Sequence, residues 1–458
     1  MLSPAFKINQ EINSAFIRSA QDHVVTLHCN KTAKGKITIA EHKKGIWSER
    51  TYPLSALPDA VNEYVGRTDV YVTQNRFYGR RRVVNLAQLD AMYVDLDYYH
   101  AGITQEPGFV MEAALLRLED ARLPRPSLVI GSGRGLYLIW LHTPVPRQAT
   151  PRWRLCQQIL HATLKDLGAD PKAQDAARVL RLVGTENSKS KTLVEALTPT
   201  GEVFDFDTLF DEIAPKTRAD IYYMRFERAK RKKNESVGTQ DEKTGFAKIE
   251  NRLTSGVLWE NRLSALQYWR QDIKQLQQLP PGERDAWMFW TANATAWLVP
   301  SLVLRREMFE LAEQVASWSE SESKQRLYAV LNRAHAMERG ETIEWDGKRY
   351  SMLYRAREEK IAEDVGITEA ERWMIYDHFG KPILCNHEIQ KDYHKNLVKN
   401  IRRTSGAKER SEYEAERKKA SEIKAEEAKK LFEQGWTNQE IAKELMMSKR
   451  QIIRLRMG

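Results

Sequence analysis

Hydrophobic residues in the first 200 positions occur in short runs that polar and turn-forming residues separate. The runs are rich in Val, Ile, Tyr and Leu, a composition typical of β-strands. Between them, residues 107–123 and 151–167 carry apolar side chains at three- and four-residue spacing, which predicts helices. We therefore expect an α/β (α+β) domain over residues 1–220. Its predicted strands lie at 23–29, 36–40, 45–52, 69–73, 91–97, 127–130 and 136–141.

The pattern changes after residue 220. A run of basic residues followed by polar ones predicts a linker over 221–245. Residues 246–400 show a helical period and many Trp residues, which predicts an all-α accessory domain with an aromatic core. Within it, Asp346-Gly347 is the signal of a tight turn and predicts a small β-hairpin near 343–352.

The C-terminal pattern predicts a charged helix at 401–424 and a small domain at 425–458. Thr437 with Glu440, and Ser448 with Gln451, have the spacing of capping boxes, so each pair predicts the start of a short helix. Three short helices in this order form a helix–turn–helix, whose last helix enters the DNA major groove. A protein-interaction tail is the alternative. The side chains expected to face DNA are Lys449, Arg450, Gln451, Arg454 and Arg456.

Composition indicates the partners and the cellular compartment to expect. The 458 residues carry a net charge of +10, which suits a nucleic-acid partner or another anionic surface. Cys29, Cys156 and Cys385 are far apart and form no C-x-x-C, so neither a zinc site nor a disulfide framework is expected. The sequence shows no secretion signal and no apolar run near the roughly 18 residues that a membrane helix needs. A cytoplasmic protein without a membrane partner is therefore expected.

Two carboxylates stand out at the end of the strand predicted at 91–97. Side chains at positions i and i+2 of a strand point to the same face, so Asp95 and Asp97 should lie side by side. Adjacent carboxylates repel each other unless a cation or hydrogen-bond donors lie between them. Hard cations such as Mg²⁺ prefer oxygen ligands. The pair predicts a metal site, with a solvated strand end as the alternative.

Two further stretches contain residues suited to phosphate binding. Gly131 to Gly135 join two apolar runs through a Gly/Ser/Arg loop, where backbone N–H groups and Arg134 could approach phosphate closely. A plain tight turn is the alternative. Residues 169–189 add the acids Asp170 and Asp175, then basic residues around a short strand. No G-x-x-x-x-G-K-[ST] motif is present, which argues against a P-loop motor.

The order of these motifs resembles the archaeo-eukaryotic primase superfamily. The motifs follow in the order Asp-x-Asp, Ser-Gly-Arg-Gly and Asp-x-x-Arg-Val-Leu-Arg-Leu-x-Gly-Thr-x-Asn-x-Lys. The resemblance covers about residues 15–215. The stretch Tyr71–Phe77 adds to the likeness, which is to primases and primase-polymerases of plasmids and other mobile elements. The resemblance implies a catalytic domain with an RRM-like mixed sheet. The all-α region and the C-terminal helix–turn–helix match these replication proteins more loosely.

The resemblance also implies roles for residues. Asp95 and Asp97 would hold Mg²⁺ or Mn²⁺ together with a third carboxylate. We assign this to Asp175, which immediately precedes the Arg178–Arg181 strand, with Asp170 as the alternative. Tyr137 stands where the family has a phosphate-binding histidine, and Met446 stands where the helix–turn–helix usually has a glycine. The residues expected to bind the nucleotide are Ser132, Gly133, Arg134, Tyr137, Arg178, Arg181 and Lys189.

These roles describe a DNA-dependent primase, or primase-polymerase, that starts replication of a plasmid or mobile element by two-metal nucleotidyl transfer. The expected partners are a single-stranded DNA template, origin duplex DNA and nucleoside triphosphates, with a separate helicase as a further candidate. The alternative is a non-catalytic initiator or regulator that holds origin DNA through its C-terminal domain. Intact carboxylates favour the enzyme, and Tyr137 favours the alternative.

Overall fold

The computed structural model describes residues 17–28, 34–215, 245–345, 347–404 and 410–457. Most of the predicted linker at 221–245 lies outside these ranges. The chain divides into two compact units, residues 1–384 and 385–458, and each is described by itself. Within the described ranges, no helix is both long and apolar enough to cross a bilayer.

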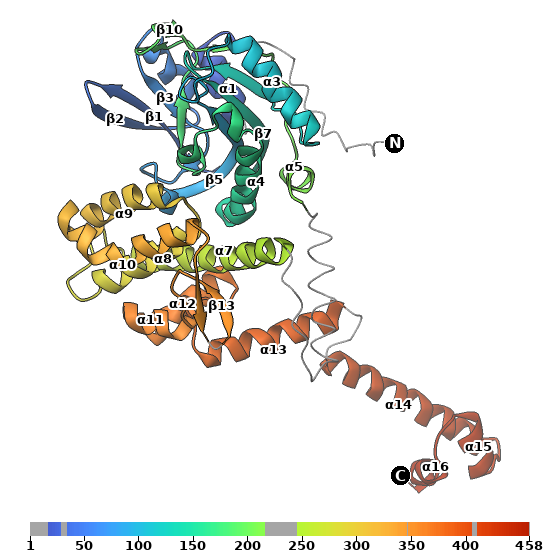
Figure 1. The fold of residues 1–458 in the computed structure, drawn as a ribbon. Helices are drawn as coiled ribbons and strands as arrows, with labels where there is room; N and C mark the ends of the chain where they lie inside the picture. Colours follow the sequence, from blue (N-terminus) through green and yellow to red (C-terminus); the bar gives the residue numbers. More distant parts are fainter. Residues whose placement is uncertain (1–16, 29–33, 216–244, 346, 405–409, 458) are drawn as a thin grey trace. The chain divides into compact units, whose positions relative to one another are not determined.

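A nine-stranded sheet forms the first half of the larger unit (Figure 1). Its two longest strands, β5 (Leu86–Leu96) and β7 (Leu136–Pro146), pair antiparallel with Asp95 opposite Tyr137. The strand order is β11-β6-β7-β5-β4-β1-β3-β8, with β2 paired to β1. The other strands are β1 (Lys36–Lys43), β2 (Ile46–Pro53), β3 (Val70–Thr73), β4 (Arg76–Phe77), β6 (Leu128–Gly131), β8 (Val179–Arg181) and β11 (Glu195–Ala196).

Two predictions for this region need correction. Neighbouring strands of the described sheet all pair antiparallel, so the expected mix of strand directions is wrong. The strand expected at 23–29 is instead helix α1 (Ala20–His28). Ser19 and Asp22 cap its start, because each backbone N–H bonds the other's side chain (3.1 and 3.0 Å). This cap and the burial of Val24 and Leu27 outweigh the β-propensity of the local sequence.

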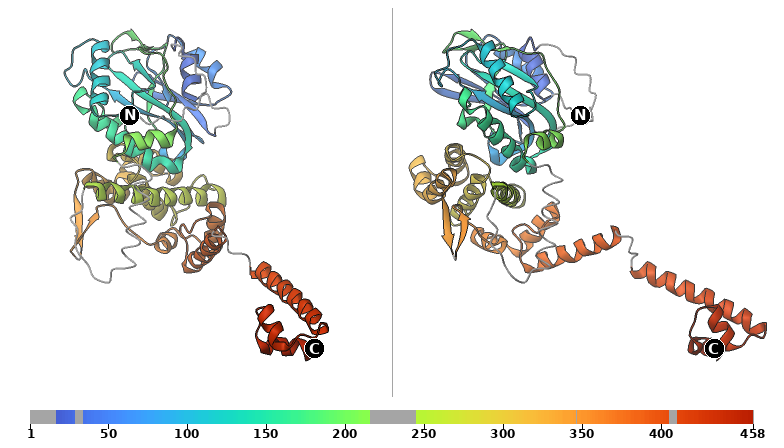
Figure 2. Two further views of the ribbon diagram at one scale, coloured as in Figure 1. Left: turned by 90° about the vertical axis from the view of Figure 1, so that its right-hand side faces the viewer. Right: turned by 45° about the vertical axis from the view of Figure 1, so that its right-hand side comes forward.

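Helices pack on this sheet (Figures 1 and 2). Helix α4 (Thr150–Thr163) lies against β5, where Trp153 Nε1 donates to Ala91 O (2.8 Å) and Gln157 Oε1 accepts from Tyr93 N (2.9 Å). Gly168, with φ +84°, ends the turn after α4 and starts the return of the chain toward β5. The remaining helices here are α2 (Leu57–Ala60), α3 (Pro107–Asp120) and α5 (Phe206–Ile213).

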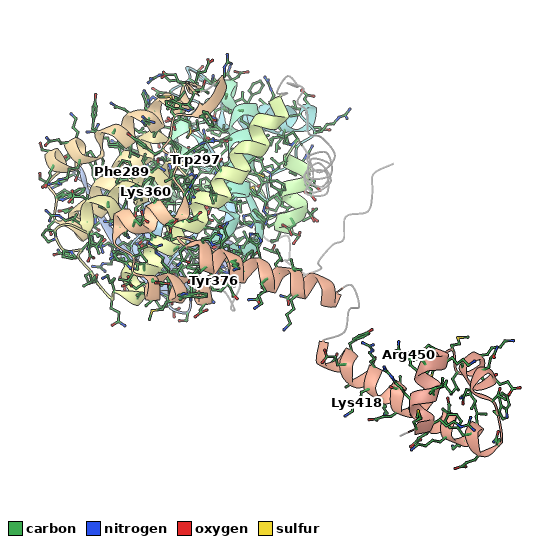
Figure 3. All side chains as sticks on the ribbon, turned by 90° about the horizontal axis from the view of Figure 1, so that it is seen from below. Phe289, Trp297, Lys360, Tyr376, Lys418 and Arg450 are labelled. Carbon is green, nitrogen blue, oxygen red and sulfur yellow. The ribbon has the colours of Figure 1, made fainter. Side chains whose placement is uncertain are left out.

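The second half of the larger unit is mainly helical. Many of its Trp residues form core, as predicted, with Trp269 and Trp287 fully buried. Figure 3 labels Phe289 and Trp297 among the side chains of this region. Its elements are α7 (Gly245–Tyr268), a π-helical turn (Trp269–Ile273), α8 (Arg284–Ala296), α9 (Ser301–Ala316), α10 (Glu320–Glu338), β12 (Thr342–Trp345), β13 (Lys348–Ser351), α11 (Glu358–Val365) and α12 (Glu369–Phe379).

The helical region and the sheet region share one hydrophobic core. Polar contacts reinforce this packing at two places. Arg147 Nε donates to the buried Glu260 Oε1 (2.7 Å), and Val83 N donates to the buried Glu307 Oε2 on α9 (2.9 Å). Arg82 Nη1 adds a bond to Gln314 Oε1 (2.7 Å). Because buried charges are costly without partners, these bonds define where α9 lies against the sheet region.

The smaller unit contains α13 (His387–Thr404), α14 (Arg410–Glu433), α15 (Asn438–Glu444) and α16 (Lys449–Met457). The last three helices pack around Ala428, Ile441 and Ile452. Met446, in the turn between α15 and α16, has φ +48°, so it adopts the left-handed conformation that a glycine usually takes.

Candidate active site

The carboxylate of Asp95 lies at the end of β5 and shares one cation with Asp170. Arg178 Nη2 lies 3.4 Å from Asp95 Oδ2 and 3.0 Å from Asp170 Oδ2. The backbone explains this approach, since Asp97 N donates to Gly168 O (2.9 Å) and Asp170 N donates to Asp95 O (2.8 Å). Residues 168–170 thus run beside the end of β5 and bring a second acid next to the first.

Burial dominates the electrostatics of Asp95. It raises the pKa of this carboxyl to about 6, while Arg178 lowers the pKa and Asp170 raises it. For Arg178, burial by itself would lower the pKa, but the neighbouring acids raise it above its ordinary value. A mostly buried acid whose charged form is costly is well suited to gain a cation as partner.

Asp97 is more open than Asp95. It follows the last residue of β5, and its side chain is 43% exposed, with Oδ2 3.6 Å from His100 Nε2. Its charge lies close enough to contribute to the raised pKa of Asp95. The two acids of the Asp-x-Asp motif are therefore neighbours in different environments.

Asp175, our expected third carboxylate, has a different set of contacts. Its side chain is fully buried, and Oδ1 accepts a hydrogen bond from Ala177 N (3.0 Å). The same oxygen lies 4.0 Å from Arg306 Nη2 on α9. In the part of the chain that the structure describes, no three acidic, His or Cys side chains already form a metal-binding group. The geometry therefore favours Asp170, the alternative, as the acid that accompanies Asp95.

Three side chains hold the loop that carries these residues. The carbonyls of residues 175–177 accept hydrogen bonds from Tyr93 Oη (2.5 Å), Asn75 Nδ2 (3.0 Å) and Arg81 Nη1 (2.7 Å), in that order. The sequence pattern predicts no role for these three side chains, although Asn75 lies in the Tyr71–Phe77 stretch that resembles replication proteins. They determine where Arg178 stands relative to the acids.

The glycine loop packs against the hairpin of β9 (Glu186–Asn187) and β10 (Thr192–Leu193). Asn187 Nδ2 donates to Ser132 O (2.6 Å), and Arg134 Nη2 donates to Lys189 O (2.9 Å). Two sequence-distant stretches that we expected to bind phosphate are thus adjacent. Gly133 has φ +98°, a conformation that glycine adopts without strain.

Replacing Gly133 with alanine is expected to destabilise this junction by roughly 1–3 kcal/mol, from a strained φ and steric overlap. A Cβ there would collide with the hydroxyls of Ser190 and Thr192. Gly102→Ala is the matched control, because Gly102 also has positive φ but open space around it. Urea unfolding of both variants measures the difference. If both variants lose the same free energy of unfolding, the steric overlap at Gly133 adds nothing to the cost of its positive φ.

Arg181 and Tyr137 lie within the same part of the sheet region. Arg181 Nη1 bonds Asp69 Oδ1 (2.5 Å) and its guanidinium lies 4.8 Å from the centre of the Tyr71 ring. Asp69 also accepts from Ser188 N (3.2 Å) and from the Ser188 hydroxyl, contacts that sequence reasoning missed. Burial raises the pKa of Tyr137, and Asp95 adds to this shift, so its hydroxyl keeps its proton at neutral pH.

The predicted DNA-facing residues of the tail fall into two groups. Lys449, Arg450 and Arg454 on α16 are exposed, and Figure 3 labels Arg450. Gln451 Oε1 instead accepts from the Ser448 backbone (3.0 Å), completing the predicted capping box. Arg456 is also exposed, and its Nη1 donates to Asn438 Oδ1 (2.8 Å).

Comparison with known proteins finds a likeness to replication proteins. The chain is 34% identical over 212 residues to the "Replication protein" of Clostridium perfringens. This match covers 45% of the chain and 50% of the relative, so it spans about half of that protein. The predicted resemblance to replication proteins is confirmed over that part. No family model matches the chain.

Solved structures give weaker likenesses. One is the AEP domain of the cyanophage S-2L primase-polymerase, at 20% identity and a TM-score of 0.32, covering 44% of this chain and all of that one. Another is the catalytic domain of primase RepB′ in complex with initiator DNA, at 14% identity and a TM-score of 0.28, covering 46% and 96%. These scores are too low to carry a structural argument.

Proposed function

We propose that this protein is a primase, or primase-polymerase, that joins nucleotides on a single-stranded DNA template to start replication of a plasmid or mobile element. The observation that carries the proposal is the pair of acids, Asp95 and Asp170, around one cationic position at the end of β5. The match to a curated replication protein supports the biological setting.

The acids fit a divalent metal. Asp95, Asp97 and Asp170 offer only oxygen ligands, as Mg²⁺ and Mn²⁺ prefer, and Arg178 already marks a cation position between two of them. When bound, the metals would supply Lewis-acid stabilisation of the attacking and leaving oxygens. Asp175, the acid first chosen, stays the alternative third ligand.

In this proposal the chain's own cations hold the triphosphate. Arg134 and Lys189 meet where the glycine loop contacts the β9–β10 hairpin, and Ser132 and Gly133 belong to that loop. The protonated Tyr137, opposite Asp95 in the β5–β7 pairing, would supply a further donor, and so would Arg181, whose charge acts on Tyr137. Fixed donors around a triphosphate position its reacting atom, which is the main task of a nucleotidyl transferase.

The test is a primer-synthesis assay. Full-length protein is incubated with single-stranded DNA, Mg²⁺ or Mn²⁺ and labelled nucleotides, and the products are separated by size. Short labelled products that require both template and metal are expected. Their absence with both metals, across ribo- and deoxynucleotides and templates of varied sequence, would favour the non-catalytic initiator.

We further propose that the tail binds duplex DNA at the origin. Replacing Lys449, Arg450 and Arg454 together with alanine should abolish preference for one duplex sequence, since each good base contact contributes roughly 1–3 kcal/mol of discrimination. Salt-sensitive binding without sequence preference should remain. A duplex selected from a random pool and its scrambled version, compared by gel shift, measure the effect.

The charge-matched control replaces Arg417, Lys418 and Lys419, which are exposed on α14, with alanine. It should weaken binding to both duplexes alike. If the α16 variant keeps its full preference, the tail does not read sequence, and the protein-interaction alternative gains support.

A further inference from the structure

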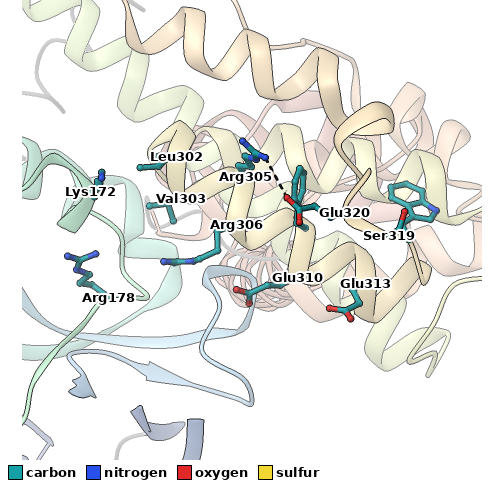
Figure 4. Close-up of a pocket in the computed structure, with 12 residues that line it drawn as sticks. Lys172, Arg178, Leu302, Val303, Arg305, Arg306, Glu310, Glu313, Ser319 and Glu320 are labelled. Atoms are coloured by element: carbon teal, nitrogen blue, oxygen red, sulfur yellow. Dashed lines mark ion pairs between the residues drawn. The ribbon is translucent and has the colours of Figure 1, made fainter. Parts of the chain in front are cut away.

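A pocket of about 690 Å³ lies between the loop of residues 171–178 and helix α9 (Figure 4). Lys172 and Arg178 line one wall, and residues of α9 and the start of α10 line the other. Arg178 is also the side chain that contacts Asp95 and Asp170. The pocket therefore opens directly beside the candidate active site.

The end of the pocket near the acids is basic. Figure 4 shows Arg306 extending from α9 toward the wall with Lys172 and Arg178. Arg306 is 43% exposed and contacts Glu307 Oε1 (3.4 Å), while Asp175 Oδ1 at 4.0 Å is beyond hydrogen-bond distance. Because a guanidinium has five N–H donors, most of those of Arg306 remain available to a ligand.

The other end of the pocket has a different charge. Arg305, the neighbour of Arg306, forms an ion pair with Glu320 (3.6 Å) and lies over the Phe309 ring. Glu310 and Glu313 also line the pocket, one and two turns beyond Arg306 on α9, and Glu310 forms an ion pair with Arg82 (3.4 Å). An anion would therefore be held at the Lys172, Arg178 and Arg306 end, which we call the basic end.

Arg306 is held in place by the packing of its helix. The next residue, Glu307, is buried and accepts from Val83 N (2.9 Å). Gln314, about two turns further along α9, accepts from Arg82 (2.7 Å). A cation that the scaffold already orients loses little entropy when it binds a ligand. The helical region thus presents a positioned guanidinium to the candidate site.

We propose that the basic end binds a phosphate group carried by a nucleic-acid strand or by a nucleotide, with Arg306 of the helical region as a binding residue. This inference rests on the proposed function, which supplies both phosphate sources. Arginine forms two parallel hydrogen bonds to phosphate, and Lys172 and Arg178 add charge from the opposite wall.

Two binding measurements on the full chain with Arg306→Gln test the inference. Fluorescence anisotropy follows a labelled single-stranded oligonucleotide over a series of salt concentrations, and separately a fluorescent nucleoside triphosphate, both with chelator present. Roughly tenfold weaker binding of one or both probes is expected from losing a charge-assisted contact. For the oligonucleotide, the slope of log affinity against log salt should fall by about 0.7.

Arg305→Gln is the matched control, one residue away on the same helix and already paired with Glu320. Lys172→Gln, at an exposed position on the other wall, is a second test that does not depend on the folding of an α9 variant. Loss with the oligonucleotide alone assigns the site to a strand, and loss with the triphosphate alone assigns it to a nucleotide.

The inference is overturned if both probes bind Arg306→Gln and Lys172→Gln as tightly as they bind Arg305→Gln. Because these measurements need no catalysis, they separate the two proposals. Wild-type protein that makes no primers but binds a probe through Arg306 would contradict the proposed enzyme and leave this site standing.

Discussion

Replacing Asp95 with asparagine is expected to reduce nucleotide incorporation at least about a hundredfold. The carboxylate is mostly buried and faces one cation together with Asp170, so its replacement removes one of the two charges at the proposed metal position. Losing one metal ligand removes several kcal/mol of transition-state stabilisation, and each 1.36 kcal/mol is about tenfold in rate. Asp97→Asn should lose activity for the same reason. Primer synthesis at saturating nucleotide measures both effects.

The matched control is Asp166→Asn. Asp166 is 77% exposed and lies 3.7 Å from Arg117 at the surface, so its replacement should leave incorporation unchanged. Thermal unfolding of all three variants checks that the fold is intact. Product yields from Asp95→Asn close to those of Asp166→Asn would remove Asp95 from the metal site.

Asp170→Asn is expected to be as severe as Asp95→Asn, whereas Asp175→Asn should retain most activity. Asp170 shares Arg178 with Asp95, so its charge acts at the proposed metal position. Asp175 has no such ion pair with Arg178 among the described contacts. Its Oδ1 accepts a hydrogen bond from Ala177 N, as Asp170 Oδ1 does from Lys172 N, and the carbonyl of asparagine can still accept this bond. The two substitutions are matched in size and chemistry.

The measurement is primer yield as a function of Mn²⁺ concentration. Asp170→Asn should need more metal to reach half of its maximal yield, while Asp175→Asn should follow the wild-type curve. The opposite ranking would return the third ligand to Asp175, as position in the sequence first suggested.

Local sequence was sufficient for much of the fold. Strand β5 (Leu86–Leu96) overlaps the strand predicted at 91–97, and α4 (Thr150–Thr163) overlaps the helix predicted at 151–167. The glycine loop at 131–135 joins two strands, as predicted. The capping box of Thr437 and Glu440 also forms as predicted. These features depend on neighbours within a few residues, so the alternation of side chains and the capping residues already contain the information.

Two features of the structure depend on interactions that the local sequence does not contain. The Val-rich segment at 23–29 has β-propensity, but an N-terminal cap and a buried helical face make it α1. The sequence favours Asp175 over Asp170 as the third carboxylate because Asp175 is nearer in sequence to the strand of Arg178. The choice depends instead on which backbone segment pairs with the end of β5, and residues 168–170 do so.

The sequence by itself determined the order of motifs, the two acids at the end of β5, the residue types expected to bind phosphate and the capped helices of the tail. Tertiary structure alone decided which acid joins Asp95 and which side chains hold the loop of Arg178. It also placed Arg306, from a helix about 130 residues later in the chain, beside Lys172 and Arg178. The physical reason is that these contacts join segments with no local relation, so packing of the shared core and pairing of buried polar groups determine them.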